Sequence, residues 1–188
     1  MTLKDDQFEF NGIKKIRPAA RAVVLNTENK VGLLHVHGKD DFFGFRDYYE
    51  TPGGGIDENE TPQETVIREV REEIGGICSE IEEIGIVEDD YNLIFTHNVV
   101  YYFLVRVDKF IEKQLLDYEK GWIDEVCWFD INEAIEKMKN SPNSKLAILQ
   151  KRRELPILQI AKEMIKTQKY WGFAMFLNFI FDILNTII

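Results

Sequence analysis

Cysteine and proline are scarce in this sequence. Its 188 residues include 2 cysteines and 5 prolines, so the composition differs from those of disulfide-stapled, collagen-like and disordered chains. Hydrophobic residues make up 45% of the chain, which is enough to build a hydrophobic core at this length. The sequence therefore predicts a folded globular protein with a single domain of ordinary size.

Basic residues are fewer than acidic ones. There are 23 Lys and Arg against 33 Asp and Glu, which gives a formal net charge of -10. Proteins bind a nucleic acid backbone mainly through Lys and Arg, so this charge disfavours a long nucleic acid as a partner. A small phosphorylated ligand held through a metal ion remains compatible with it.

Export signals and cysteine metal motifs are also lacking. Residues Met1–Asn11 are acidic, without the basic start and apolar run of a secretory signal. Cys78 and Cys127 lie far apart and form no Cys-x-x-Cys pair. We therefore expect buried thiols in a reducing, cytoplasmic setting.

The C-terminal segment Tyr170–Ile188 is almost entirely apolar and close to the roughly 20 residues that span a bilayer. Asn178, Asp182 and Asn185 share one stripe of a helix over about Phe173–Ile187. An Asp in the middle of a single span would cost about 2.5–3.5 kcal/mol. The pattern favours packing on the domain or on a second copy, as in a homodimer, with membrane contact as the alternative.

Apolar runs and helical periodicities alternate along the rest of the chain. Strands are predicted over Arg17–Asn26, Val31–Val36, Glu80–Glu88, Asn98–Val107 and Val126–Phe129. Helices are predicted after Asp130 and over Leu155–Ile165, and Gly38–Tyr49 is predicted to be a loop. This order indicates an α/β or α+β sandwich with one sheet between helices.

The helix predicted over about Pro62–Ile74 has well-defined ends. Thr61 and Glu64 form a capping box around Pro62, which suits the first helical position. Gly75 provides a C-terminal stop. The sequence therefore predicts which side chains share a face of this helix.

Three glutamates, Glu69, Glu72 and Glu73, share one face that borders the apolar stripe of this helix. Arg68 is spaced i, i+4 from Glu72 and can hold that carboxylate in place. A solvated, charge-rich helix is the alternative. Three like charges in one patch repel each other, however, and such patches are typical of cation sites. Oxygen ligands suit Mg²⁺ or Mn²⁺ rather than zinc, and no histidine spacing predicts a competing metal site.

Gly54, Glu60 and the run Arg68–Gly75 resemble the Nudix box, in which a glycine and a glutamate precede an REUXEEXGU core with U a bulky aliphatic residue. Gly76 departs from the pattern, because the final aliphatic residue, Ile77, comes one place later. The resemblance implies a Nudix α/β/α sandwich, an α/β fold with a mixed sheet between helices. It assigns residues 1–168 to the Nudix domain and leaves residues 169–188 as an added apolar C-terminal helix.

The resemblance also implies an activity, the hydrolysis of a pyrophosphate bond in a nucleoside diphosphate linked to another group, with Mg²⁺ or Mn²⁺. By position, Glu69, Glu72 and Glu73 match the metal-binding and catalytic glutamates of the family. A backbone carbonyl of the glycine loop, from Gly53 or Gly54, commonly joins them as a ligand. A Nudix-fold module that senses a nucleotide without cleaving it is the alternative function.

The resemblance also suggests bracing residues and candidates for the general base. Glu60 and Arg68 match family residues that brace the loop and the helix. The general base is either a box glutamate or one from a later loop, for which Glu125 is a better candidate than Glu119 because it lies nearer a predicted strand. Either of the two can instead be a solvated loop residue.

Two arginines are candidates for substrate contacts. Arg21 and Arg46 can reach a phosphate, although such residues are more often packing or salt-bridge residues. His35, His37 and His97 show no pairing that indicates catalysis. The subfamily markers that would identify the substrate are mostly missing, so the sequence does not predict the identity of the group linked to the diphosphate.

Overall fold

The computed structural model describes the backbone of residues 1–40, 44–115 and 121–187, and the side chains of these residues except 39, 40, 44, 124 and 169–187. The strands are β1 (Thr2–Leu3), β2 (Lys15–Leu25), β3 (Val31–Asp40), β4 (Gly44–Glu50), β5 (Gly53–Gly55), β6 (Gly76–Tyr91), β7 (Thr96–Phe110) and β8 (Ile123–Phe129). The helical elements are α1 (Pro62–Glu69), the π-helical turn η1 (Val70–Ile74), the 3-10 turn η2 (Asn92–Ile94), α2 (Ile131–Lys139) and α3 (Lys145–Ile187).

One mixed sheet forms the centre of the fold. Its strand order is β1-β6-β7-β2-β3-β4, with β5 paired to β2 and β8 paired to β3. The pair β2–β7 is parallel, whereas β2–β3 and β6–β7 are antiparallel. β2 lies in the middle of this order and is buried on both faces from Ala19 to Leu25, which explains its continuously apolar sequence.

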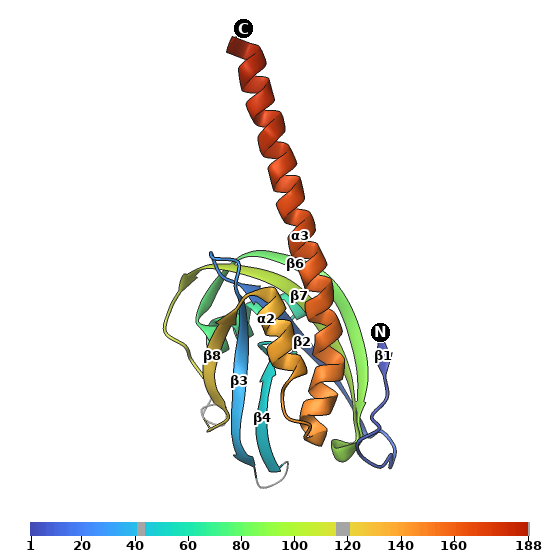
Figure 1. Ribbon diagram of the computed structural model, residues 1–188. Coiled ribbons are helices and arrows are strands. Elements are labelled where there is room, and N and C mark those ends of the chain that lie inside the picture. Colours follow the sequence, from blue (N-terminus) through green and yellow to red (C-terminus); the bar gives the residue numbers. More distant parts are fainter. Residues whose placement is uncertain (41–43, 116–120, 188) are drawn as a thin grey trace.

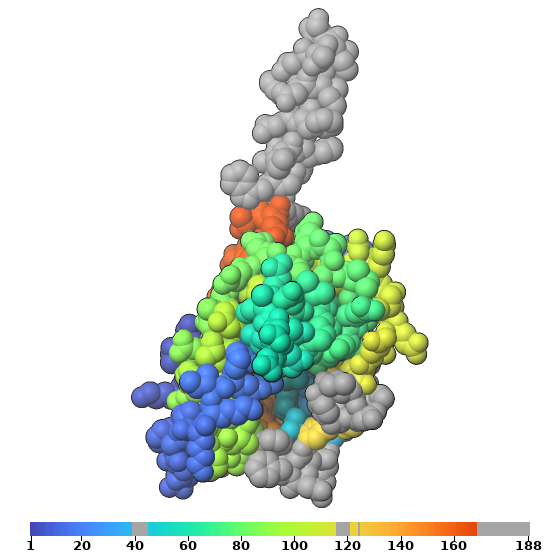
Figure 2. Space-filling view, turned by 180° about the vertical axis from the view of Figure 1, so that it is seen from behind, coloured from blue at the N-terminus to red at the C-terminus, as the bar shows by residue number. Residues whose placement is uncertain are grey.

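Different helices cover the two faces of the sheet. Ala20 and Val24 of β2 pack in one core cluster with Val66 of α1. Val23, which points to the other face because side chains alternate along a strand, packs with Leu158 of α3. Figure 1 shows α2 and α3 in front of the sheet, and the view from behind in Figure 2 shows the teal residues of α1 on the opposite face. The predicted α/β/α sandwich is confirmed.

Two predicted elements differ from the structure. The segment Gly38–Tyr49 is predicted to be a loop, but its residues 38–40 belong to β3 and its residues 44–49 to β4, while 41–43 lie outside the described residues. The two strands pair along His35–Tyr49 and His37–Asp47. The sequence of this segment does not alternate between apolar and polar residues, so no strand was predicted there. The strand β4 is stabilised instead by pairing with its neighbour. The helix predicted from Leu155 begins instead at Lys145, so Pro156 lies inside α3 and not in its first turn.

The C-terminal segment continues α3. The helix runs to Ile187, and Figure 1 shows its last part extending away from the sheet. The side chains of 169–187 lie outside the described residues, so the predicted packing of this tail stays a prediction. Within the described residues, no helix is long and apolar enough to cross a membrane.

Candidate metal centre

The carboxylate helix, defined here as α1 and η1 together (Pro62–Ile74), begins at the predicted capping box. The Glu64 N–H donates to Thr61 Oγ1 at 3.2 Å, and the Thr61 N–H donates to Glu64 Oε2 at 2.8 Å. These reciprocal bonds satisfy amides that the first turn leaves unpaired. The start of the helix is therefore fixed, as the sequence predicts.

The second half of this helix is a π-helical turn. The Gly75 N–H bonds to the carbonyls of Arg71 and Val70, and Gly75 adopts the left-handed conformation with φ 76°. π-Turns inside α-helices are rare and occur often at functional sites. Here the transition falls between Glu69 and Val70, so that Glu69 lies on the α-helical side and the other two glutamates on the π-helical side.

Two of the three predicted metal ligands are buried beside the glycine strand β5. Glu69 is 6% exposed and Glu73 is 5% exposed. The Gly53 N–H donates to Glu73 Oε2 at 2.7 Å, and Glu69 lies against Gly54. The structure therefore brings Gly53, Gly54, Glu69 and Glu73 together, although they are up to 20 residues apart in the sequence.

Arg68 connects the carboxylates to the loop that precedes the helix. Its guanidinium donates two bonds to Glu60, at 2.8 and 3.0 Å, one to Glu69 at 2.8 Å and one to Glu72 at 3.2 Å. It also bonds the carbonyl of Gly55 at 3.2 Å. Such charge-assisted bonds hold carboxylates in defined positions. Arg68 therefore links Glu60 of the preceding loop to two carboxylates of the helix, and the bracing roles of Glu60 and Arg68 stay a prediction.

The electrostatics of the centre are unfavourable without a cation. Burial and the neighbouring charge of Glu69 raise the pKa of Glu73 well above its usual value, against the opposite effect of Arg21. Two buried carboxylates this close repel each other when both are ionised. A hard divalent cation bound by carboxylate and carbonyl oxygens offsets that repulsion. The donor set of Glu69, Glu72, Glu73 and the β5 carbonyls fits such an ion.

Glu72 is the most accessible of the three glutamates, with 25% of its side chain exposed. Its backbone carbonyl accepts a bond from the Gln114 N–H at 3.0 Å. A hollow of about 370 Å³ beside it is lined by Arg68, Glu72, Gln114 and three further residues of the carboxylate helix. Solvent and a substrate can therefore reach the centre at Glu72.

The structure places Arg21 in a buried ion-pair network. This residue is 8% exposed, and its guanidinium pairs with Glu154 of α3 at 3.0 Å and with Glu50 at 3.2 Å. It also donates to the carbonyl of Thr51 at 3.1 Å, so it joins β2 to α3. The phosphate contact predicted for Arg21 stays a prediction.

Arg46 lies on β4 with its guanidinium carbon 3.8 Å from the centre of the Trp122 ring. It lines a cavity of about 110 Å³ between β4, β6 and α3, together with Tyr91 and Arg153. Its contact with a substrate stays a prediction.

Glu125 lies on β8, on the side away from α1. Val126 pairs with Leu34 and packs on the α1 side, whereas Glu125 pairs with His35. Because side chains alternate along a strand, Glu125 projects from the other face of β8. Its role as the general base stays a prediction. Glu119, the other candidate, lies outside the described residues.

Sequence reasoning missed one group of residues on that opposite face. His35, His37 and Asp47 place their ligand atoms within 4.8 Å of one another. The spacing of His35 and His37, two residues apart on a strand, was an available signal. The sequence could not show that Asp47 lies beside these histidines, because the segment of β4 was predicted to be a loop.

Comparisons with known proteins agree with the geometry of the carboxylate helix. A model of the NUDIX domain family matches residues 15–150. An RNA pyrophosphohydrolase of Sulfurovum sp. (strain NBC37-1) is 30% identical over 138 residues, which cover 66% of this chain and 84% of that protein. An RNA pyrophosphohydrolase of Hydrogenovibrio crunogenus is 34% identical over 76 residues, but this match covers 39% of the chain and only 40% of the relative.

A solved structure shows the same fold. The NUDIX domain of Shewanella oneidensis NrtR, crystallised with ADP ribose, superposes with a TM-score of 0.59 over 81% of this chain and 90% of that chain. Its sequence identity is 18%, so this likeness concerns the fold alone.

Proposed function

Because the chain belongs to the Nudix hydrolase family, we propose that it hydrolyses a pyrophosphate bond in a nucleoside diphosphate linked to another group, at the carboxylate helix. The observation that carries this proposal is the arrangement of Glu69, Glu72 and Glu73 around Arg68, beside the glycines of β5. Nudix hydrolases generally require a divalent metal ion. We propose Mg²⁺ or Mn²⁺ as the ion here, because all the candidate ligands are oxygen atoms.

The ligand set proposed for that ion is Glu69, Glu72, Glu73 and the carbonyl of Gly54. A divalent ion supplies two effects at such a site, neutralisation of the diphosphate charge and activation of an attacking water. The residues of the chain hold the ligand carboxylates in position. Arg68 holds two of the carboxylates, and the Gly53 N–H orients the third.

The water-activating base is proposed to be a glutamate of the carboxylate helix. Two observations support this proposal: Glu125 pairs with His35 on the strand face away from α1, and Glu73 bonds to the glycine strand through the Gly53 N–H. Glu72 is the best placed of the three glutamates to contact solvent, because the side chains of the other two are nearly buried.

The substrate is proposed to be a small nucleotide. Two relatives of the chain are RNA pyrophosphohydrolases, so an RNA 5′ end is a further substrate to test. The net charge of -10 weighs against binding along an RNA chain but does not affect recognition of its terminal phosphates in the presence of a divalent ion.

A substrate panel tests this proposal. The purified chain is incubated with nucleoside triphosphates, nucleotide sugars, dinucleotides, capped RNA and 5′-triphosphate RNA, with Mg²⁺ or Mn²⁺. Glu72→Gln should lower turnover by orders of magnitude and weaken metal binding with the fold intact, because it removes a ligand charge and relieves repulsion. Glu125→Gln is the matched control and should keep full turnover.

Three results would contradict the proposal. One is the absence of turnover with every substrate and either ion. Another is tight binding of a nucleotide that stays intact after metal is added, which would favour the sensing module. The third is unchanged turnover in Glu72→Gln, which would place the reaction elsewhere.

We further propose a cytoplasmic location and a homodimer formed through the C-terminal helix. The sequence has 2 cysteines, and both are half-buried, which suits a reducing compartment. The apolar sequence of 170–188 supports the dimer, since large apolar surfaces mark interfaces.

A further inference from the structure

The strands β3 and β4 carry a second group of side chains of the types that bind metals, on the face opposite α1. His35 and His37 are two residues apart on β3, so both project from that face. Asp47 is the residue of β4 that pairs with His37. His35 Nε2 lies 3.1 Å from Asp47 Oδ1, and His37 Nδ1 lies 3.8 Å from the same oxygen.

These distances suit a tetrahedral metal ion. Zinc bonds of roughly 2.0–2.1 Å to nitrogen and oxygen place neighbouring ligand atoms about 3.3 Å apart. The separations of 3.1 and 3.8 Å lie on either side of that value, and all three ligand atoms lie within 4.8 Å of one another. Small side-chain rotations are therefore sufficient to bind one ion through the three groups.

Aromatic neighbours hold both imidazoles in place. The ring of Tyr49 stacks on His35, with centroids 5.0 Å apart and planes at 29°. The ring of Phe45 meets His37 edge-on, with centroids 5.1 Å apart. Packing of this kind reduces the side-chain entropy that is lost when a ligand is ordered around an ion.

The surroundings of this group are negatively charged. Glu125 pairs with His35 across the sheet. A negative potential at this face attracts a cation.

We propose that His35, His37 and Asp47 bind a transition-metal ion of the zinc class, at a site separate from the carboxylate helix and on the opposite face of the sheet. Imidazole nitrogens select zinc and its neighbours, whereas Mg²⁺ prefers oxygen ligands. Three protein ligands leave one coordination position for solvent or an external ligand.

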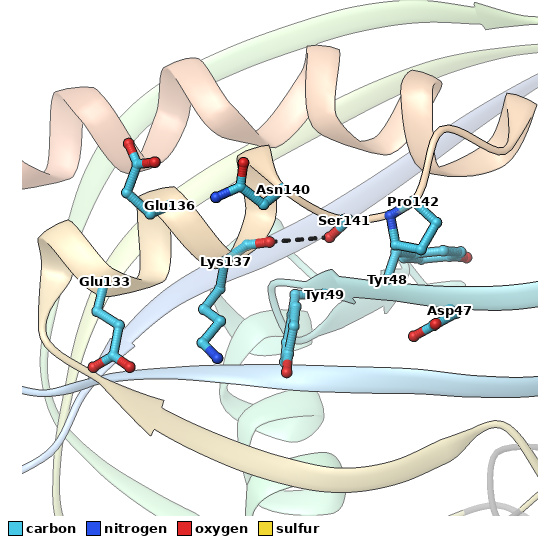
Figure 3. Close-up of a pocket in the computed structure, with 9 residues that line it drawn as sticks. All are labelled: Asp47, Tyr48, Tyr49, Glu133, Glu136, Lys137, Asn140, Ser141 and Pro142. Carbon is cyan, nitrogen blue, oxygen red and sulfur yellow. Dashed lines mark hydrogen bonds between the residues drawn. The ribbon is translucent and has the colours of Figure 1, made fainter.

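The site lies at the edge of a pocket. Asp47 and Tyr49 line a cavity of about 360 Å³ together with Lys137 of α2 and six further residues. Figure 3 shows Asp47 at one end of this pocket and the side chain of Lys137 beside the ring of Tyr49. An ion bound at Asp47 is therefore accessible from solvent, and an anionic group that enters the pocket meets both the ion and a lysine.

A zinc titration in excess Mg²⁺ tests the proposal, because Mg²⁺ occupies the carboxylate helix. Zn²⁺ affinity is measured by competition with a chromophoric chelator, and Co²⁺ substitution reports nitrogen ligands through its visible absorption. The full chain should bind one ion with a tetrahedral Co²⁺ spectrum. His37→Gln and Asp47→Asn should each weaken binding at least about tenfold.

Two variants serve as controls. His97 also contacts two carboxylates, Asp90 at 2.8 Å and Glu88 at 3.5 Å, but through different ring nitrogens, so it cannot chelate one ion with both. His97→Gln should therefore keep the wild-type affinity, and so should Glu72→Gln. Far-UV circular dichroism checks folding, and Asp47→Asn decides the question if His37→Gln does not fold.

Three outcomes would overturn the proposal. The first is the absence of Zn²⁺ binding by the Mg²⁺-saturated chain. The second is an equal affinity in the wild type and Asp47→Asn. The third is a loss of binding in Glu72→Gln, which would place the ion at the carboxylate helix.

Discussion

The carboxylate of Glu69 lies so close to Gly54 that a Cβ atom on Gly54 would overlap its Oε1 atom. The glycine strand β5 and the carboxylate helix are therefore packed at a distance that no larger residue allows. Glycine lets a backbone approach a ligand site closely. This contact explains why a glycine occurs at the first position of the sequence motif.

Gly54→Ala should damage the metal centre without unfolding the chain. The added methyl group must displace Glu69, and a displaced ligand should lower metal affinity and turnover by about tenfold or more. Isothermal titration with Mn²⁺ and a turnover assay measure both quantities. Gly121→Ala is the control, since nothing lies within 4 Å of a Cβ atom there. Equal affinities in the two variants would contradict the close-approach argument.

Glu60→Gln should destabilise the protein in a pH-dependent way. Hydrogen bonds from Arg68 lower the pKa of Glu60 from 4.5 to about 2. A carboxylate with a lowered pKa stabilises the folded state fully above 4.5, and this contribution is lost as the pH falls towards 2. The side chain is 23% exposed, so we expect a loss of only about 1 kcal/mol at pH 7.

Urea unfolding at pH 7 and at successively lower pH checks this expectation. The difference between the wild type and Glu60→Gln should shrink as the pH falls below 4.5. Glu58→Gln, an exposed position in the same loop, should have no effect at any pH. A loss that stays constant down to the lowest pH would show that the lost charge is not its cause.

Local signals were sufficient to predict the ends of the carboxylate helix. The capping box at Thr61 and the stop at Gly75 act over a few residues, so both could be read from the sequence and both are confirmed. The shared face of the three glutamates follows from helix geometry alone. The π-turn could not be predicted, because it depends on how the last turn packs on the sheet.

Features that depend on strand pairing could not be predicted from the sequence. β4 is stabilised by its pairing with β3, a contact between segments that no local pattern reports. The orientation of Glu125 depends on one residue of register, and a shift by one residue exchanges the two faces of a strand. Arg21 appeared free to contact phosphate because its partner Glu154 is distant in the sequence.

Arg21→Met should cause a large loss of stability. Removal of Arg21 takes away the nearer of two counter-ions of Glu154, which is fully buried and keeps its pair with Arg153 at 3.7 Å. Breaking a buried ion pair costs about 3–5 kcal/mol. Thermal and urea unfolding measure the loss. Arg152→Met removes an exposed pair with Asp6 and should change stability by less than about 1 kcal/mol.

The same variant tests the predicted phosphate contact of Arg21. Since this residue belongs to a buried network, the folded fraction of Arg21→Met should keep the wild-type KM for its substrate. Wild-type stability combined with a raised KM would restore the phosphate contact that the sequence suggested.

Removal of the C-terminal tail tests the proposed dimer. A chain truncated after Lys169 keeps the part of α3 that packs on the core, including Leu158 and Ala161, so it should fold and retain turnover. The removed residues 170–188 are apolar except for one polar stripe. Burial of apolar surface at about 25 cal/mol per Å² favours association through such a segment, and two-fold dimers are the commonest oligomers.

Sedimentation of the two forms separates the alternatives for this tail. We expect the full chain to sediment as a dimer and the truncated chain as a monomer, because the tail provides the interface. If both forms are monomers, the tail packs within its own chain and the dimer is wrong. If the full chain floats with liposomes and the truncated chain does not, the segment binds a membrane, and the polar stripe of Asn178, Asp182 and Asn185 must then face the headgroups.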